Sequence, residues 1–205
     1  MAAAVPTLPV MTVEEFLALP DTVEKLELVR GEVRVTPQAG GPHGLAGANV
    51  IFAPTTHVRQ HQLGRVFGDG VGYELTRIPH TVRAPDASFV RTDRLPPNGI
   101  EAGLLKMTPD LAVEVLSPSE TASSLEEKLH DYTVAGTPLI WVVDPERRAI
   151  MTEAADAPVS WLFEGDSVDG GGVIPGFTCA VAEIFHGIAR SPAGVMTREP
   201  STTEE

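Results

Sequence analysis

Two acidic residues and one lysine occupy positions where their charge needs an explanation. Glu114 interrupts an otherwise apolar run over 111–116, which is typical of a strand covered on both faces. A carboxylate in such a strand must be paired, protonated or bound to a metal ion, because an isolated buried charge is too costly. Asp86 follows Pro85 in an earlier strand candidate, and Lys128 lies in a helix candidate after Glu114. Glu114 is therefore a candidate functional residue with two candidate partners.

Two carboxylates and a lysine together have a coherent chemical use. Neighbouring carboxylates repel each other unless a proton or a cation lies between them. All-oxygen ligands suit Mg²⁺ or Mn²⁺, which keep several waters and bind phosphate well. A nearby lysine can orient an attacking water, favour its deprotonation and neutralise charge that builds on the phosphate. We therefore predict metal-assisted phosphodiester hydrolysis, with Asp86, Glu114 and Lys128 as catalytic residues and the two carboxylates as metal ligands.

Two strands must bring the carboxylates together. The stretch 81–90 is expected to continue one sheet across Pro85, and alternation then gives Asp86 the same face as Ser88 and Val90. If this stretch lies beside strand 110–116, Asp86 and the buried glutamate converge on one point.

A helix must supply the lysine. Ser123-Ser-Leu-Glu126 is a capping-box pattern that predicts the start of this helix, and Gly136 predicts its end. At 100° per residue, Lys128 falls at the edge of an apolar stripe and leans toward the sheet. The stripe consists of Leu125, Leu129 and Tyr132, whereas Glu126, Glu127, His130 and Asp131 are expected to be solvated.

The surrounding pattern predicts an α/β domain with a central mixed sheet flanked by helices. Strand 110–116, the helix and a second apolar strand at 139–143 form a crossover unit, so the two strands should be parallel. The other expected elements are a helix after the capping box Thr12–Glu15, a hairpin over 26–35, a helix over 43–62 that contains Pro54, short strands at 65–67, 72–75 and 81–83, a loop over 92–107, and an antiparallel ribbon of 149–152 and 161–163.

Length and composition limit the class of protein. The 205 residues suit a single domain over 11–190, with a loose leader at 1–10 and a disordered tail at 191–205 rich in Ser, Thr, Pro and Glu. No apolar stretch reaches the roughly 20 residues of a membrane helix, and the N-terminus has no basic region of a signal peptide. The single cysteine, Cys179, excludes an intramolecular disulfide and a zinc–cysteine cluster. We expect a cytoplasmic protein.

The net charge weighs against a strongly electrostatic nucleic-acid binder. The chain carries 28 acidic and 15 basic residues, for a formal charge of −13. Affinity for phosphate backbones comes largely from Lys and Arg, so this excess lowers the expectation of nucleic-acid binding. A local basic groove can nevertheless coexist with an acidic whole.

The order and spacing of these residues resemble the active site of the PD-(D/E)XK nuclease superfamily. Within it, the chain is similar to the bacterial putative restriction endonuclease family over roughly 11–187. The matching segments are Leu26-Glu-Leu-Val-Arg-Gly-Glu32, Arg83-Ala-Pro-Asp-Ala-Ser-Phe-Val90, Pro109-Asp-Leu-Ala-Val-Glu-Val-Leu-Ser-Pro-Ser119, Glu126-Glu-Lys-Leu-His-Asp-Tyr132, Leu139-Ile-Trp-Val-Val-Asp-Pro145 and Pro175-Gly-Phe177.

This resemblance implies a restriction-endonuclease-like fold, a Mg²⁺ or Mn²⁺ cofactor and DNA as the partner. The superfamily lysine usually follows the second acid by two residues, where this chain has Leu116, and the resemblance implies that Lys128 replaces it from the helix. It also implies that the backbone carbonyl of Val115 contacts the metal, that Glu27 adds a carboxylate, and that His43 lies near the site, although a helix-capping role for His43 is an equal alternative.

Each residue also has an ordinary structural explanation. Asp86 could be a turn residue, Glu114 could pair with Arg83, and Lys128 could be a solvated residue at a helix edge. Taken together they favour a divalent-metal-dependent endonuclease that hydrolyses DNA, for which a homodimer would supply two sites. The alternative is a catalytically weak nuclease-fold module for nucleic-acid or protein interaction, and a third option is hydrolysis of a small phosphate substrate.

Overall fold

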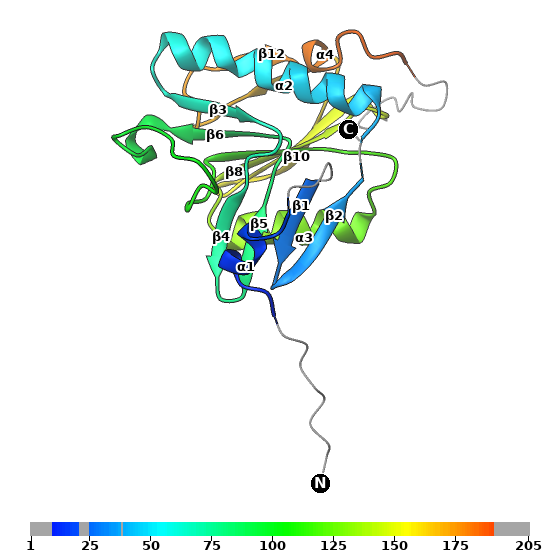
Figure 1. Ribbon diagram of the computed structural model, residues 1–205. Helices are drawn as coiled ribbons and strands as arrows, with labels where there is room; N and C mark the ends of the chain where they lie inside the picture. The colour runs from blue at the N-terminus through cyan, green and yellow to red at the C-terminus, as the bar shows by residue number, and fades with distance from the viewer. Residues whose placement is uncertain (1–9, 21–24, 38, 191–205) are drawn as a thin grey trace.

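Figure 1 shows the computed structural model of the chain, which describes residues 10–20, 25–37 and 39–190. The tail expected over 191–205, and all of the expected leader except Val10, lie outside the described residues. The architecture is α/β, with a central mixed sheet flanked by helices, as predicted. Within the described part of the chain, no helix is both long and apolar enough to cross a membrane.

A six-stranded sheet with the strand order β10-β9-β8-β7-β6-β3 forms the centre of the molecule. β7 (Leu111–Val115) and β8 (Leu139–Asp144) are parallel, and helix α3 (Ala122–Val134) connects them, which confirms the predicted crossover. The other neighbouring pairs of this sheet are antiparallel. Its other strands are β3 (Gly64–Gly68), β6 (Ala87–Arg91), β9 (Ala149–Ala154) and β10 (Ala157–Phe163), so the predicted ribbon is also confirmed.

A second sheet, with the strand order β2-β1-β5-β4, carries the predicted hairpin. A two-residue turn joins β1 to β2, and both of its residues, Arg30 and Gly31, have positive φ angles of 51° and 80°. Turns of this kind match the twist of the flanking strands. The four strands are β1 (Lys25–Val29), β2 (Glu32–Thr36), β4 (Tyr73–Arg77) and β5 (His80–Arg83).

The expectation that 81–90 continues a single sheet is wrong. β5 ends at Arg83 in the second sheet, whereas β6 begins at Ala87 in the central sheet. Pro85 between them has no N–H to donate to a ladder, so the chain leaves one sheet and enters the other around it. Asp86 therefore lies at a bend where the two sheets meet.

The two faces of the central sheet carry different layers (Figure 1). Helices α2 (Gly41–Gln60) and α4 (Val181–Ile184) cover one face, and Val113 and Val115 of β7 point into the core on that side. On the other face, Ala112 packs with Tyr132 of α3 and with residues of β4. Because side chains alternate along a strand, Glu114 projects toward α3. The remaining elements are α1 (Val13–Leu17), a 3₁₀ turn (Thr92–Arg94), β11 (Ser167–Asp169) and β12 (Thr178–Ala180).

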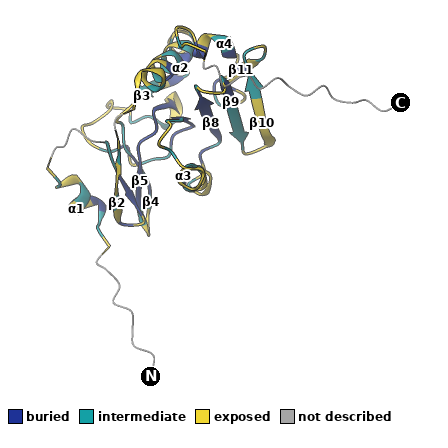
Figure 2. Ribbon diagram, turned by 90° about the vertical axis from the view of Figure 1, so that its right-hand side faces the viewer, coloured by how far each residue is buried: buried dark blue, intermediate teal, exposed yellow. Residues whose placement is uncertain are grey.

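The helix starts follow the predicted capping logic with one correction. The predicted box at Thr12 and Glu15 caps α1. For α3 the expected cap at Ser123 is wrong, because the hydroxyl of Thr121 accepts from the backbone N–H of Ser124 at 3.1 Å and the helix begins at Ala122. Helix α2 includes Pro54 without ending there, and its exposed and buried sides are visible in Figure 2. Its buried stripe is Ala46, Val50, Pro54 and Val58.

Gly64 is a place where the central sheet tolerates no side chain. A Cβ at this position would lie 2.1 Å from the carbonyl oxygen of Val90 and 2.6 Å from the ring of Phe89. We expect Gly64→Ala to lower the free energy of unfolding by about 1–3 kcal/mol, the usual cost of overpacking. Gly47→Ala, in α2 with open space around it, is the control and should raise it by up to about 1 kcal/mol. Equal stability of Gly64→Ala and the wild type in urea unfolding would contradict this packing.

Candidate active site

The backbone of β7 holds Asp86 directly beside Glu114. The amide of Asp86 donates to the carbonyl of Val113 at 3.0 Å, and its Oδ2 accepts from the N–H of Val115 at 2.8 Å. The register of β6 and β7 ends with Ala87 opposite Val113. Because Asp86 contacts Val113 and Val115, the two neighbours of Glu114 in β7, it lies beside Glu114. The structure thus brings the two predicted carboxylates together.

Glu114 is almost completely buried, with 1% of its surface exposed. Its Oε2 accepts from Nζ of Lys128 at 3.0 Å, and its Oε1 accepts from the hydroxyl of Tyr132 at 2.8 Å. Burial raises the pKa of Glu114, the Lys128 ammonium lowers it, and the charge of Asp86 raises it, with a net rise to about 7. The repulsion between the two carboxylates is therefore part of the site, and a cation near both would relieve it.

Lys128 reaches Glu114 from α3 with a side chain that is only 12% exposed. Its Nζ also lies 2.9 Å from Oε1 of Glu120. Burial alone would lower the pKa of Lys128, but the charges of Glu114 and Glu120 outweigh burial and raise it. The side chain is thus a charged ammonium at neutral pH, at the place expected from helical phase.

Two further basic side chains contact Asp86 from other elements. Lys25, the first residue of β1, places Nζ 2.9 Å from Oδ1 of Asp86 and 2.7 Å from Oδ1 of Asp69. His43, in the first turn of α2, places Nε2 3.3 Å from Oδ2 of Asp86. The residue that caps α2 is Gly40, so the capping alternative for His43 is wrong.

These contacts keep Asp86 ionised. Burial would raise the pKa of Asp86, but the hydrogen bond from His43 and the charge of Lys25 together lower it well below its usual range. The same hydrogen bond raises the pKa of His43. The site therefore combines a strongly acidic Asp86 with a weakly acidic Glu114, and an incoming cation would find one carboxylate already charged.

Glu27 holds the segment that leads to Asp86. Its Oε1 accepts from the backbone N–H of Ala84 at 2.8 Å, and its Oε2 accepts from Nη1 of Arg83 at 3.0 Å. Both carboxylate oxygens of Glu27 therefore bind residues that lie two and three positions before Asp86 in the chain. Glu27 itself is only 2% exposed. This arrangement positions Asp86, while a role for Glu27 as a metal ligand stays a prediction.

The buried partner of Arg83 is not Glu114, as one structural alternative suggested, but a pair of other acids. Arg83 donates to Oδ2 of Asp131 at 2.9 and 2.7 Å and to Glu27 at 3.0 Å. The expectation that Asp131 is solvated is thus wrong, because the turn of the β1–β2 hairpin also reaches it: Arg30 donates to Oδ1 of Asp131 at 2.9 Å. A helical wheel predicts which side chains of α3 face the central sheet, but it cannot predict that a second sheet covers another side of the helix.

An open cleft of about 930 Å³ exposes part of this arrangement to solvent. It lies between the β1–β2 hairpin, the first turn of α2 and the loop that precedes α3. Asp86, Lys25 and Lys128 line it, together with Val115, whose carbonyl was the predicted backbone metal ligand. Hydroxyl-bearing residues of the loop after β7 and of the first turn of α3 also line it, namely Ser117, Ser119, Thr121, Ser123 and Ser124.

Comparison with known proteins identifies the family of this chain. Residues 13–182 match the Uma2 family, described as "Putative restriction endonuclease". The chain belongs to the Uma2 family. A solved structure, described as a putative nuclease belonging to DUF820 from Anabaena variabilis, has the same fold, with a TM-score of 0.76 and 20% sequence identity over 85% of this chain and 97% of the other. No curated protein matches the chain.

The family supports a nuclease role, and PD-(D/E)XK-like nucleases generally use divalent metals. Two carboxylates of this Uma2 chain, those of Asp86 and Glu114, lie side by side and could bind such an ion. Asp86 already attracts one cation, the Lys25 ammonium, at 2.9 Å. Among the described residues, no three His, Cys, Asp or Glu side chains form a preformed cage. Mg²⁺ typically takes one or two carboxylates and completes its shell with waters and substrate phosphate, so a two-carboxylate site fits it.

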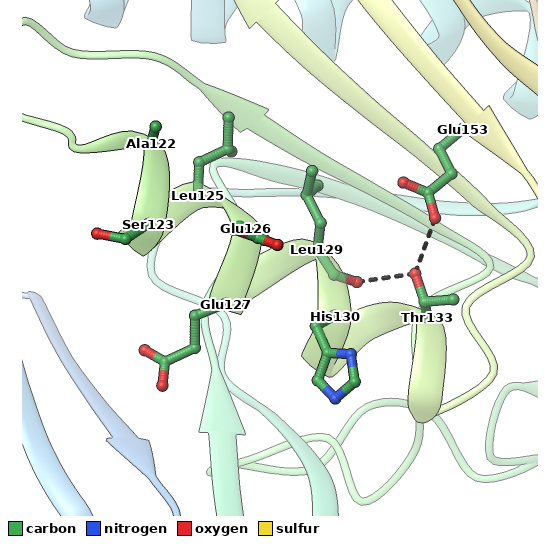
Figure 3. Close-up of a pocket in the computed structure, with 9 residues that line it drawn as sticks. All are labelled: Ala122, Ser123, Leu125, Glu126, Glu127, Leu129, His130, Thr133 and Glu153. Carbon is green, nitrogen blue, oxygen red and sulfur yellow. Dashed lines mark hydrogen bonds between the residues drawn. The ribbon is translucent and has the colours of Figure 1, made fainter.

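A different cavity, of about 630 Å³, is lined by α3 and by Glu153 of β9 (Figure 3). Leu125 and Leu129 of the expected apolar stripe both line it, and Leu129 also packs against the cluster that contains Tyr132. One of its hydroxyl groups, Thr133 Oγ1, lies 2.8 Å from the carbonyl oxygen of Leu129 and 3.0 Å from Oε1 of Glu153. This cavity contains neither Asp86, Glu114 nor Lys128, and we assign it no chemistry.

Sequence reasoning missed four polar neighbours of the predicted residues in this Uma2 chain. Lys25 carried a usable signal, because it shares the face of Glu27 at a spacing of two along β1. Tyr132 was expected only as a core residue, although it lies one helical turn after Lys128. Asp69 and Glu120 carried no such signal, since a turn and a loop bring them to the site.

Proposed function

We propose that this Uma2 chain is a divalent-metal-dependent endonuclease that hydrolyses DNA phosphodiester bonds. The observation that carries the proposal is that Asp86 bonds to the β7 backbone on both sides of Glu114 and that the Lys128 ammonium lies 3.0 Å from Glu114. The cleft gives access to Asp86 and Lys128. This is an arrangement that can bind a metal ion and a phosphate together.

The protein groups have separate tasks in this proposal. A bound divalent ion would supply Lewis-acid activation of the phosphate and of a water. Asp86 and Glu114 would hold that ion, and the Val115 carbonyl would complete the protein ligands. Lys128 would orient the attacking water and stabilise negative charge on the phosphate, because its ammonium stays charged and is held rigidly by two carboxylates. His43 and Glu27 would position Asp86 through the contacts described above.

DNA is the proposed substrate because the Uma2 family is described as a restriction endonuclease family. The net charge of −13 leaves little long-range attraction to DNA, so binding must depend on the cleft itself. There, Arg34 of the hairpin lines the cleft as an ion pair with Glu32, and His43 at the start of α2 lies beside Asp86. The proposal therefore predicts weak, salt-sensitive DNA binding with local contacts.

The direct test incubates the purified protein with supercoiled plasmid in Mg²⁺, in Mn²⁺ and in EDTA. We expect nicked or linear DNA with either metal and none in EDTA. Asp86→Asn should lose cleavage, and Asp93→Asn, an exposed aspartate of the 3₁₀ turn, should retain it. The proposal fails if the wild type cleaves no DNA with either metal, whether or not it binds them.

A second candidate function has one observation in its favour. All four oxygens of Asp86 and Glu114 already have protein partners, which are Lys25, His43, the Val115 N–H, Lys128 and Tyr132. A site so fully satisfied without metal is also compatible with a catalytically weak module for nucleic-acid or protein interaction. DNA binding that needs no metal and leads to no cleavage would favour the interaction module. Cleavage of a small phosphodiester in preference to DNA would favour a hydrolase of small phosphate substrates.

A further inference from the structure

Lys25 is a buried cation in the middle of the acidic site. Its side chain is 18% exposed, and its ammonium lies 2.9 Å from Asp86 and 2.7 Å from Asp69. The charges of Asp86 and Glu114 both act on it, and Asp86 is the residue that a metal ion would need. One positive charge therefore already occupies the position that attracts cations.

The two carboxylates that hold Lys25 differ in a way that suggests an exchange. Asp86 is buried and lies beside Glu114, whereas the Asp69 side chain is 62% exposed on the turn between β3 and β4. Asp69 Oδ1 also accepts from the backbone N–H of Gly70 at 2.8 Å, which fixes the carboxylate in place. Asp69 can thus keep the ammonium after Asp86 has released it.

We propose that Lys25 competes with the metal ion for Asp86, and that Asp69 retains the Lys25 ammonium when the ion binds. The inference deepens the proposed function and depends on its metal site. In the metal-free protein the ammonium offsets the charge of Asp86 and satisfies Oδ1. A metal ion can bind Asp86 only if the contact between Lys25 and Asp86 breaks, so Lys25 lowers the metal affinity. Asp69 makes this loss smaller, because it still pairs with the Lys25 ammonium. Lys25 is a positioning residue in this scheme and takes no part in bond breaking.

The scheme predicts opposite effects for two substitutions on metal affinity in the absence of DNA. Lys25→Met removes the competitor and should tighten Mn²⁺ binding by about tenfold, the factor that one charge-assisted hydrogen bond contributes. Asp69→Asn removes the alternative acceptor and should weaken Mn²⁺ binding, because Lys25 then loses more on leaving Asp86. In the double variant, Asp69→Asn should weaken Mn²⁺ binding less than it does in the presence of Lys25, since only the direct effect of its charge on the ion remains.

Free Mn²⁺ measured by electron paramagnetic resonance, with calorimetry as a second method, gives these affinities directly. Lys106→Met is the control for loss of a lysine, because Lys106 is exposed and remote from the cleft lining, and it should leave Mn²⁺ affinity unchanged. Asp69 is largely exposed, so Asp69→Asn keeps the test valid even if Lys25→Met folds poorly.

The outcomes separate this inference from the nuclease proposal. Unchanged or weaker Mn²⁺ binding by folded Lys25→Met, together with intact DNA cleavage, would overturn the competition and leave the nuclease standing. Tighter binding by Lys25→Met, weaker binding by Asp69→Asn and no cleavage by any form would support the competition and reject the nuclease. Absence of Mn²⁺ binding by every variant would overturn both.

Discussion

Replacement of Lys128 by methionine is expected to lower the rate of DNA cleavage by about 100-fold or more. The ammonium lies 3.0 Å from Glu114 and 2.9 Å from Glu120, so it is fixed at the site and stays charged at neutral pH. Methionine keeps much of the apolar length of the side chain but removes the charge that would orient water and stabilise the phosphate. Single-turnover cleavage of a labelled duplex at saturating Mg²⁺ measures the effect.

The chain offers a matched control for this experiment, because its three lysines are Lys25, Lys106 and Lys128. Lys106 lies exposed in the loop before β7, and Lys106→Met should cleave DNA at the wild-type rate. Mn²⁺ affinity of Lys128→Met should be unchanged or higher, since the proposed metal ligands remain and the ammonium that pairs with Glu114 is gone. Wild-type cleavage by folded Lys128→Met would remove Lys128 from the proposed chemistry.

Replacement of Arg83 by methionine is expected to lower the free energy of unfolding by about 3–5 kcal/mol, the usual cost of breaking a buried ion pair. The guanidinium is 3% exposed and donates to Glu27 and Asp131, which are themselves buried. Its removal leaves Glu27 without a cation and Asp131 with only Arg30. Urea unfolding followed by circular dichroism measures the loss.

Arg91→Met is the control for this second substitution. Arg91 is 49% exposed and pairs with Asp93, which is 62% exposed, so its replacement should cost less than about 1 kcal/mol. Arg83→Met should also reduce nuclease activity before it unfolds the protein, because Glu27 then loses one of the two contacts that hold the segment before Asp86. A loss below that of Arg91→Met would show that the buried network does not stabilise the fold.

The central strand and the crossover helix could be predicted because each follows from the pattern of residues within its own segment. Glu114 is conspicuous only because the rest of 111–116 is apolar, and that pattern is a property of one strand buried on both faces. Lys128 follows from helical phase, since the stripe that contains Tyr132 must face the sheet. The paired carboxylates and the lysine predicted a metal ion and phosphodiester hydrolysis, and family resemblance added DNA as the substrate.

The rest of the site depends on contacts between distant segments. Lys25 and Asp86 are 61 residues apart, and Arg83 and Asp131 are 48 residues apart. Period-two and helical patterns identify which face a side chain occupies but not which other element covers that face. The change of sheet at Pro85 creates both contacts, because it moves Arg83 into the second sheet and leaves Asp86 in the gap between the sheets.

The most direct test of the proposed site is the structure of crystals grown or soaked with Mn²⁺, examined by anomalous diffraction. The account predicts one strong peak within ligand distance of both Asp86 and Glu114, with the Lys25 ammonium on Asp69 and the Lys128 ammonium still beside Glu114. A Mn²⁺ concentration that supports DNA cleavage must be used. No peak at these carboxylates under that condition, with Lys25 still bound to Asp86, would contradict the account.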